Sequence, residues 1–139
     1  MINIKPLKAY TDNYIWLLET NEEVSVVDPG DAKPVLDYLS KTNKNLRDIF
    51  ITHHHFDHTA GVPELENIIS GSIYGPKNSY ELINEKVTQG DTLSSLGIKF
   101  EIIEVPGHTL DHIAFYNEEN NILFCGDTLF AGGCGRVFE

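Results

Sequence analysis

Short apolar runs alternate with polar turns along most of the chain, and this pattern predicts a protein rich in β-strands. Runs with the length and composition of strands cover 2–7, 14–19, 24–27, 48–51, 72–74, 98–105, 113–116 and 122–125. Apolar residues recur instead at helical spacing over 32–41, and helical segments are also predicted over 63–69 and 78–84. Strands with helices between them indicate sheet layers that are covered by helices on one side.

The densest group of chemically active side chains follows the predicted strand 48–51. Residues 52–58 read THHHFDH and hold four of the six histidines in the chain. On an extended or loosely coiled loop alternate side chains point to the same side, so we expect His53, His55 and Asp57 to converge. His58 lies beside Asp57. An adventitious surface tract or a purification tag is disfavoured, because tags lie at termini and lack the interleaved Asp.

Three other predicted strands end in loops that carry a His or an Asp. Asp28 follows the strand 24–27 and precedes Pro29, so it either forms the turn or supports metal ligands without binding the ion. His108 and Asp127 each follow an apolar run and a glycine. Loops at one edge of a sheet can bring these groups to the histidines, which favours both as ligands.

Together these residues predict a centre with two divalent ions that share one carboxylate. The first ion takes three imidazoles, the second takes a carboxylate and an imidazole, and one Asp bridges them: His53, His55 and His108; Asp57 and His58; and Asp127. Asp57 and Asp127 would hold a hydroxide between the ions, because a bound divalent ion lowers the pKa of water towards neutrality. The predicted chemistry is hydrolysis without a serine or cysteine nucleophile. Zinc suits these ligands best, with iron or manganese as alternatives.

Composition narrows the class of protein. A chain of 139 residues with 41% hydrophobic and 22% charged residues is typical of one soluble globular domain. A net charge of −11 without any Lys/Arg cluster argues against nucleic acid as a partner. No run approaches the apolar length of a membrane span or of a signal peptide. With only Cys125 and Cys134 available for disulfides, we expect a reducing cytoplasm.

The motifs resemble those of a known group of metal-dependent hydrolases. THHHFDH, Gly-His-Thr at 107–109 and Gly-Asp-Thr at 126–128 are similar to successive motifs of the metallo-β-lactamase superfamily, and Asp28 matches the first of its motifs. Within it, the segments 12–14, 107–113 and 125–136 resemble glyoxalase II, the hydroxyacylglutathione hydrolases. The resemblance runs from near Met1 to Glu139.

This resemblance implies an α/β (α+β) fold, the αββα sandwich, with a dinuclear metal site at one sheet edge. It implies hydrolysis of the thioester S-D-lactoylglutathione to D-lactate and glutathione. The metal roles carry over to His53, His55, Asp57, His58, His108 and Asp127. Arg136 holds the place of a basic residue that contacts glutathione in that family. Phe138 stands where some members have a substrate-contacting tyrosine.

The family pattern continues past residue 139, through further strands, another ligand His and a helical glutathione-binding domain. We therefore expect residues 1–139 to form a single domain that is truncated at its C-terminus relative to the family, without the helical domain. The second ion would lack an outer ligand, because His112 lies too close to His108 to replace it easily. An uncovered sheet face favours a homodimer, and we expect weak or no thioesterase activity from this length of chain.

Two alternatives to a thioesterase stay open. A persulfide dioxygenase of the same superfamily holds a single iron with two His and one Asp, a set that His53, His108 and Asp127 can supply. The Gly-Cys-Gly-Arg block at 133–136 favours the thioesterase. The other alternative is a metal-binding or oligomerising remnant without catalysis, which the missing ligand and substrate domain motivate.

Overall fold

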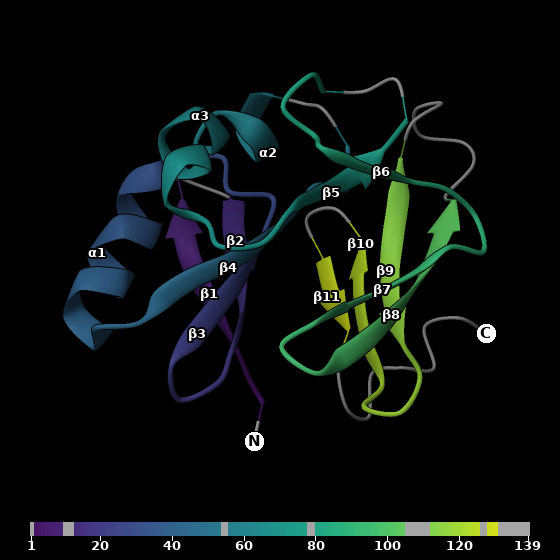
Figure 1. Cartoon of the computed structure of the whole chain (residues 1–139), viewed down its shortest axis with the longest axis horizontal. Coiled ribbons are helices and arrows are strands. Elements are labelled where there is room, and N and C mark those ends of the chain that lie inside the picture. The colour runs from purple at the N-terminus through teal and green to yellow at the C-terminus, as the bar shows by residue number, and fades with distance from the viewer. Residues whose placement is uncertain are drawn as a thin grey trace.

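Two β-sheets pack against each other, and helices lie on the outer side of the first sheet (Figure 1). The computed structural model describes residues 2–9, 13–53, 56–77, 80–104, 112–125 and 128–130, without the side chains of 9, 13, 56–57 and 128–130. None of the helices in these ranges is long and apolar enough to cross a membrane.

The first sheet carries the strands that lead to the histidines. Its strands lie in chain order: β1 (Asn3–Ala9), β2 (Asn13–Glu19), β3 (Glu23–Val27), β4 (Asn45–Phe50), β5 (Ile73–Pro76) and β6 (Glu85–Val87). The pairs β1–β2 and β2–β3 are antiparallel, whereas β3 to β6 run parallel. The carboxyl ends of β3 and β4 therefore meet at one edge of the sheet.

Helices connect the parallel strands of this sheet. Helix α1 (Ala32–Thr42) joins β3 to β4, and Asp31 caps it by accepting a hydrogen bond from the Lys33 N–H at 3.1 Å. The helix ends at Asn43, whose φ of 57° is the left-handed conformation common after a helix. Helices α2 (Phe56–Thr59) and α3 (Val62–Leu65) follow β4, and a 3₁₀ turn η1 (Glu66–Ile68) leads on to β5.

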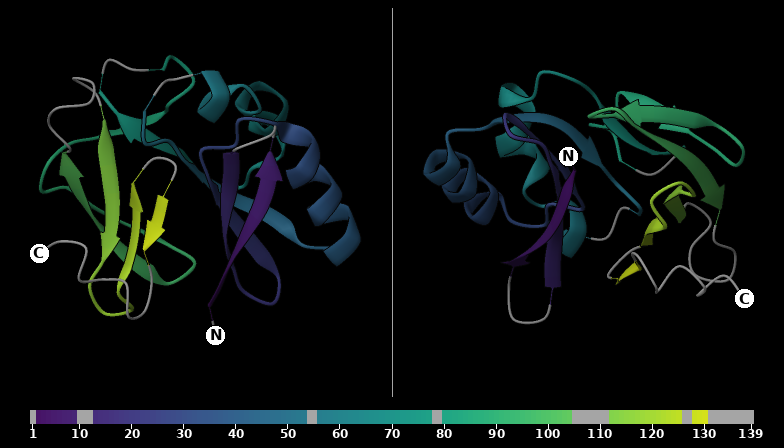
Figure 2. Two further views of the ribbon diagram at one scale, coloured as in Figure 1. Left: turned by 180° about the vertical axis from the view of Figure 1, so that it is seen from behind. Right: turned by 90° about the horizontal axis from the view of Figure 1, so that it is seen from below.

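The second sheet is antiparallel throughout. Its strands are β7 (Thr92–Ser95), β8 (Ile98–Glu104), β9 (Ile113–Asn117), β10 (Ile122–Cys125) and β11 (Thr128–Phe130), in the order β11-β10-β9-β8-β7. Seen from behind and from below, it lies on the side of the first sheet that α1 does not cover (Figure 2).

Side-chain alternation along the strands divides the core into two parts. On β2, Ile15 and Leu17 pack with the helices, while Leu18 belongs to the core between the sheets. In that inter-sheet core the ring of Phe50 stacks on Phe115, with centroids 4.9 Å apart. Both sheets are thus held by apolar burial on their facing sides.

Hydrogen bonds of buried polar side chains also join the two sheets. The buried Asp48 on β4 accepts a hydrogen bond from the Ser95 hydroxyl of β7 at 2.6 Å and another from the Ser72 N–H at 2.8 Å. The hydroxyls of Ser95 and Ser25 lie 2.7 Å apart, and Ser25 Oγ accepts from the Asp48 N–H at 3.2 Å. We call Ser25, Asp48, Ser72 and Ser95 the inter-sheet network. Its mutual hydrogen bonds offset the cost of burying a carboxylate.

The apolar runs and the first helix agree with the predicted elements to within a few residues at their ends. The helical segment predicted over 78–84 is wrong in its described part, because residues 80–84 form turns. Strands β6, β7 and β11 were not predicted, since each has only three or four residues. The expected helices on one side of the sheet layers are present.

Candidate metal centre

Backbone hydrogen bonds bring three strand ends together beside His53. Asp28, just after β3, donates its N–H to the carbonyl oxygen of Phe50 at the end of β4, at 2.8 Å. Ile113, the first residue of β9, donates its N–H to the carbonyl oxygen of Thr52 at 2.9 Å. The segment that follows β4 is therefore tied to both sheets.

The Asp28 carboxylate anchors this segment. Its Oδ1 accepts the Thr52 N–H at 2.7 Å, and its Oδ2 accepts the Thr52 hydroxyl at 2.6 Å. Oδ2 also lies 3.1 Å from Nδ1 of His58, and only 2% of Asp28 is exposed. Asp28 has a φ of 52°, a left-handed conformation that Asp tolerates better than most residues. A strained backbone at a buried acid is typical of functional positions.

These contacts assign the protons on the two histidines. The Thr52 hydroxyl has one proton, which it donates to Asp28, so its oxygen accepts from Nδ1 of His53 at 2.8 Å. A carboxylate only accepts, so His58 also donates from Nδ1. Both rings consequently keep the lone pair on Nε2, the form in which imidazole binds a metal ion.

Asp28, His53 and His58 form a group that can hold a metal ion. One ligand atom from each lies within 4.8 Å of the others, and all three residues are buried. Two imidazoles and a carboxylate suit divalent transition metals such as zinc. Because both oxygens of Asp28 already accept hydrogen bonds, the histidines are the better placed ligands and Asp28 orients them.

The remaining predicted site residues lie outside what the structure describes. His55, His108, Asp127, Arg136 and Phe138 fall in undescribed segments. Asp57 lies on α2, but its side chain is not described. The predicted extended loop is wrong from Phe56 onward, because 56–59 form α2. Strand alternation therefore does not apply to His58, which lies on this helix.

Sequence reasoning gave no role to Thr52 and set His112 aside. The His112 ring stacks on His53, with centroids 4.7 Å apart and planes at 27°, and the His53 and His58 centroids are 4.3 Å apart. The sequence positions of both residues could have indicated these roles. His112 directly precedes the strand that begins at Ile113, and Thr52 directly precedes the histidines.

Gly61 lets the α2–α3 turn approach the loop after Asp28. Its N–H donates to the carbonyl oxygen of Pro29 at 2.9 Å. A Cβ at this position would lie 2.6 Å from both that oxygen and the backbone nitrogen of Ala32. The close approach fixes the helix that carries His58 against the loop that carries Asp28.

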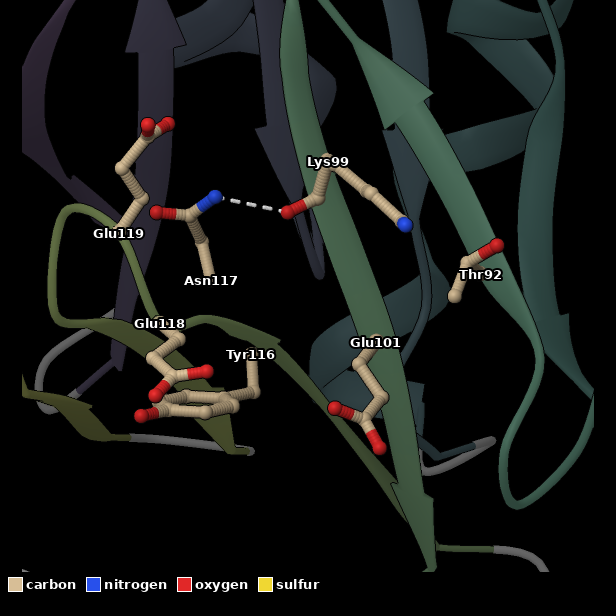
Figure 3. Close-up of a pocket in the computed structure, with 7 residues that line it drawn as sticks. All are labelled: Thr92, Lys99, Glu101, Tyr116, Asn117, Glu118 and Glu119. Carbon is tan, nitrogen blue, oxygen red and sulfur yellow. Dashed lines mark hydrogen bonds between the residues drawn. The ribbon is translucent and has the colours of Figure 1, made fainter.

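A pocket of about 560 Å³ lies elsewhere, on the second sheet (Figure 3). It is lined by Thr92, Lys99, Glu101, Tyr116, Asn117, Glu118 and Glu119. The Asn117 amide donates to the carbonyl oxygen of Lys99 at 2.7 Å, as the close-up shows. No predicted site residue lines this pocket, so the histidine group and not the pocket identifies the candidate centre.

Comparison with known families decides the wider class. The model of the metallo-β-lactamase superfamily matches residues 11–139. The chain belongs to this superfamily. Membership confirms the expected fold class, of which the described residues supply both sheets and the helices on the first. Together with the group of Asp28, His53 and His58, it supports binding of a divalent metal ion.

Curated relatives confirm the resemblance to glyoxalase II. A hydroxyacylglutathione hydrolase from Pseudoalteromonas translucida is 51% identical over 146 residues, which cover 100% of this chain and 55% of the relative. One from Chromohalobacter salexigens is 50% identical over 143 residues, covering 100% of this chain and 56% of the relative. The chain thus spans about half the length of these relatives.

Solved structures of the superfamily share the fold. The BLEG-1 B3 metallo-β-lactamase is similar with a TM-score of 0.75 and 18% identity, over 87% of this chain and 70% of that one. ETHE1 from Myxococcus xanthus is similar with a TM-score of 0.67 and 25% identity, over 95% of this chain and 56% of that one. These likenesses support the architecture and carry no argument about the substrate.

Proposed function

We propose that this chain takes part in the metal-dependent hydrolysis of S-(2-hydroxyacyl)glutathione thioesters, converting S-D-lactoylglutathione to D-lactate and glutathione. The observation that carries the proposal is the hydrogen-bonded set in which Asp28 and Thr52 accept from Nδ1 of His58 and His53, so that both rings carry their lone pair on Nε2. The substrate class rests on the names of relatives about half identical over the whole chain.

The residues of the chain prepare the centre before substrate arrives. Asp28 and Thr52 hold the protons of both histidines on Nδ1, so neither ring has to change tautomer to bind an ion. Burial of these groups strengthens every electrostatic interaction among them. When bound, divalent ions supply an activated water and polarise the thioester carbonyl.

The proposed ligand set extends beyond the described residues. We assign His53, His55 and His108 to one ion, Asp57 and His58 to a second, and Asp127 as the bridge, with zinc as the first choice of metal. Arg136 and Phe138 are the proposed substrate contacts. We further propose that the protein works in the cytoplasm and forms a homodimer.

The test is release of glutathione thiol from S-D-lactoylglutathione by the zinc-loaded chain. Turnover that disappears both on metal removal and in His53→Ala supports the proposal. Lys33→Ala is the matched control, because Lys33 is exposed and its ammonium pairs with the exposed Asp37 one turn further along α1. A folded sample that holds stoichiometric metal and releases no thiol from any acylglutathione contradicts the proposal. That result would favour a metal-binding or oligomerising protein without catalytic activity.

The chain loaded with iron instead of zinc tests the dioxygenase alternative. A persulfide dioxygenase would hold one iron on His53, His108 and Asp127 and consume oxygen with glutathione persulfide. Oxygen consumption by the iron-loaded chain, without thioester hydrolysis by any metal form, would replace the proposed function with this one.

A further inference from the structure

Among the histidines that the structure describes, one beside the site has no assigned role. His112 is half-buried, and its ring lies nearly parallel to that of His53 at a centroid distance of 4.7 Å. It is not a member of the group whose ligand atoms all lie within 4.8 Å, which Asp28, His53 and His58 form. Its observed contact in the site is the stack on the proposed ligand His53.

The backbone builds this stack. The N–H of Ile113 donates to the carbonyl oxygen of Thr52, and both of these residues are buried. Each is the chain neighbour of one member of the stacked pair. Residues 112 and 53 are thereby held side by side, although one precedes a strand of the second sheet and the other follows a strand of the first.

The His53 ring needs a second constraint. Its contact with Thr52 fixes Nδ1, but the torsion that turns an imidazole about its bond to Cβ has a broad minimum. A ring packed on the face of His53 restricts that rotation, and stacked aromatic pairs are favourable beyond the area they bury. The Thr52 contact sets the tautomer, and the stack sets the plane in which Nε2 points.

We propose that His112 is a positioning residue of the metal centre, and that its ring acts by stacking on His53 and aiming Nε2 of that ligand at the ion. The inference rests on His53 binding metal, as in the proposed function, and is independent of the thioester substrate. It assigns the second sheet a direct part in shaping the centre.

The experiment compares His112→Phe, which keeps a planar ring, with His112→Ala and His112→Leu, which lose it. Zinc affinity is measured by competition with a chromophoric chelator, and the absorption spectrum of the cobalt-substituted chain reports ligand geometry. We expect roughly tenfold weaker binding and an altered cobalt spectrum in Ala and Leu, and near wild-type values in Phe. Tyr116→Ala is the matched control for removing an aromatic side chain from β9.

Two results would overturn the inference. One is unchanged zinc affinity and cobalt spectrum in His112→Leu, which fills the volume without a ring and decides the matter if the Ala variant does not fold. The other is a Phe variant as weak as Leu, which would assign the effect to a ring nitrogen. Both readouts report metal alone, so absence of thioester turnover would count against the proposed function and leave this inference standing.

Discussion

Thr52 donates both its backbone N–H and its hydroxyl to the Asp28 carboxylate, over 2.7 and 2.6 Å. This pair of bonds joins the ends of two parallel strands, and through the hydroxyl oxygen it also controls the proton on His53. The metal-binding tautomer of His53 is thus set by a residue that is not one of the proposed ligands.

Replacing Thr52 with Val should therefore damage metal binding more than the fold. Val has nearly the same shape but lacks the hydroxyl, so His53 Nδ1 loses its acceptor and Asp28 loses a donor. We expect roughly 10- to 100-fold weaker zinc binding and a loss of about 1–3 kcal/mol in unfolding free energy. Chelator competition and urea denaturation measure the two. Thr52→Ser, which keeps the hydroxyl, should bind zinc like wild type. Equal losses of zinc affinity in the Val and Ser variants would contradict a role for the hydroxyl in holding the proton of His53.

Gly61→Ala should destabilise the loop that carries Asp28. The new Cβ would meet backbone atoms of Pro29 and Ala32, which cannot turn aside as a side chain could. We expect a loss of about 1–3 kcal/mol in urea denaturation, as for other overpacked sites. Glu64→Ala on α3 is exposed and should change stability by less than about 0.5 kcal/mol. Wild-type stability in Gly61→Ala would show that this turn is not closely packed in solution.

Ser95→Ala should weaken the contact between the sheets. The change removes the hydroxyl that donates to the buried Asp48 and lies against Ser25, at an expected cost of about 1–3 kcal/mol. A double-mutant cycle with Ser25→Ala should show a coupling of about 0.5–3 kcal/mol, because the two hydroxyls share one network. Ser94→Ala, the exposed neighbour on β7, is the control. Additive losses would mean that the hydroxyls act separately.

The fold could be predicted from the sequence where burial imposes a pattern. Strand β2 and the end of β4 carry apolar residues on both faces, because helices cover one side and the second sheet covers the other. Strand β6 has a single buried residue, Val87, and its pairing with β5 is set by tertiary contacts that no local pattern contains. Helix α2 has four residues, too few to show a helical period.

The site could be predicted in its residue types and only partly in its geometry. His53 and His58 stand out because histidines interleaved with an Asp are a metal-ligand pattern. The hydrogen bonds from Thr52 to Asp28 depend on the parallel pairing of β3 with β4. That pairing cannot be predicted from the local sequence pattern of either strand. His112 reaches His53 only because β9 is tied to Thr52 across the two sheets.

Glu19 should make stability depend on pH. Burial raises the pKa of its carboxyl, but hydrogen bonds from Lys44, Tyr38 and Lys5 outweigh this and leave the pKa below the ordinary value of 4.5. The charged form is thus favoured in the fold. Its stabilisation is complete above the unfolded pKa and is lost as the pH falls through the folded pKa.

Glu19→Gln should accordingly be less stable than wild type at pH 7 in urea denaturation, and the difference should shrink as the pH falls below the ordinary carboxyl pKa of 4.5 and then through the lower pKa of folded Glu19. Asp37→Asn is the control, since Asp37 is an exposed carboxylate in a surface pair with Lys33. A difference that stays constant from pH 7 to pH 3 would contradict a role for the charge.

The most direct test of the central claim is the metal content per chain, measured by elemental mass spectrometry on protein purified without chelator or added metal. We predict at least one divalent ion per folded chain, both in wild type and in the Lys33→Ala control. We predict loss of metal in His53→Ala and reduced metal occupancy in Asp28→Asn. Asn tolerates the left-handed backbone of position 28, but it has a single acceptor oxygen in place of the two that accept from Thr52 and His58. Full metal content in folded His53→Ala would contradict the assignment of this centre.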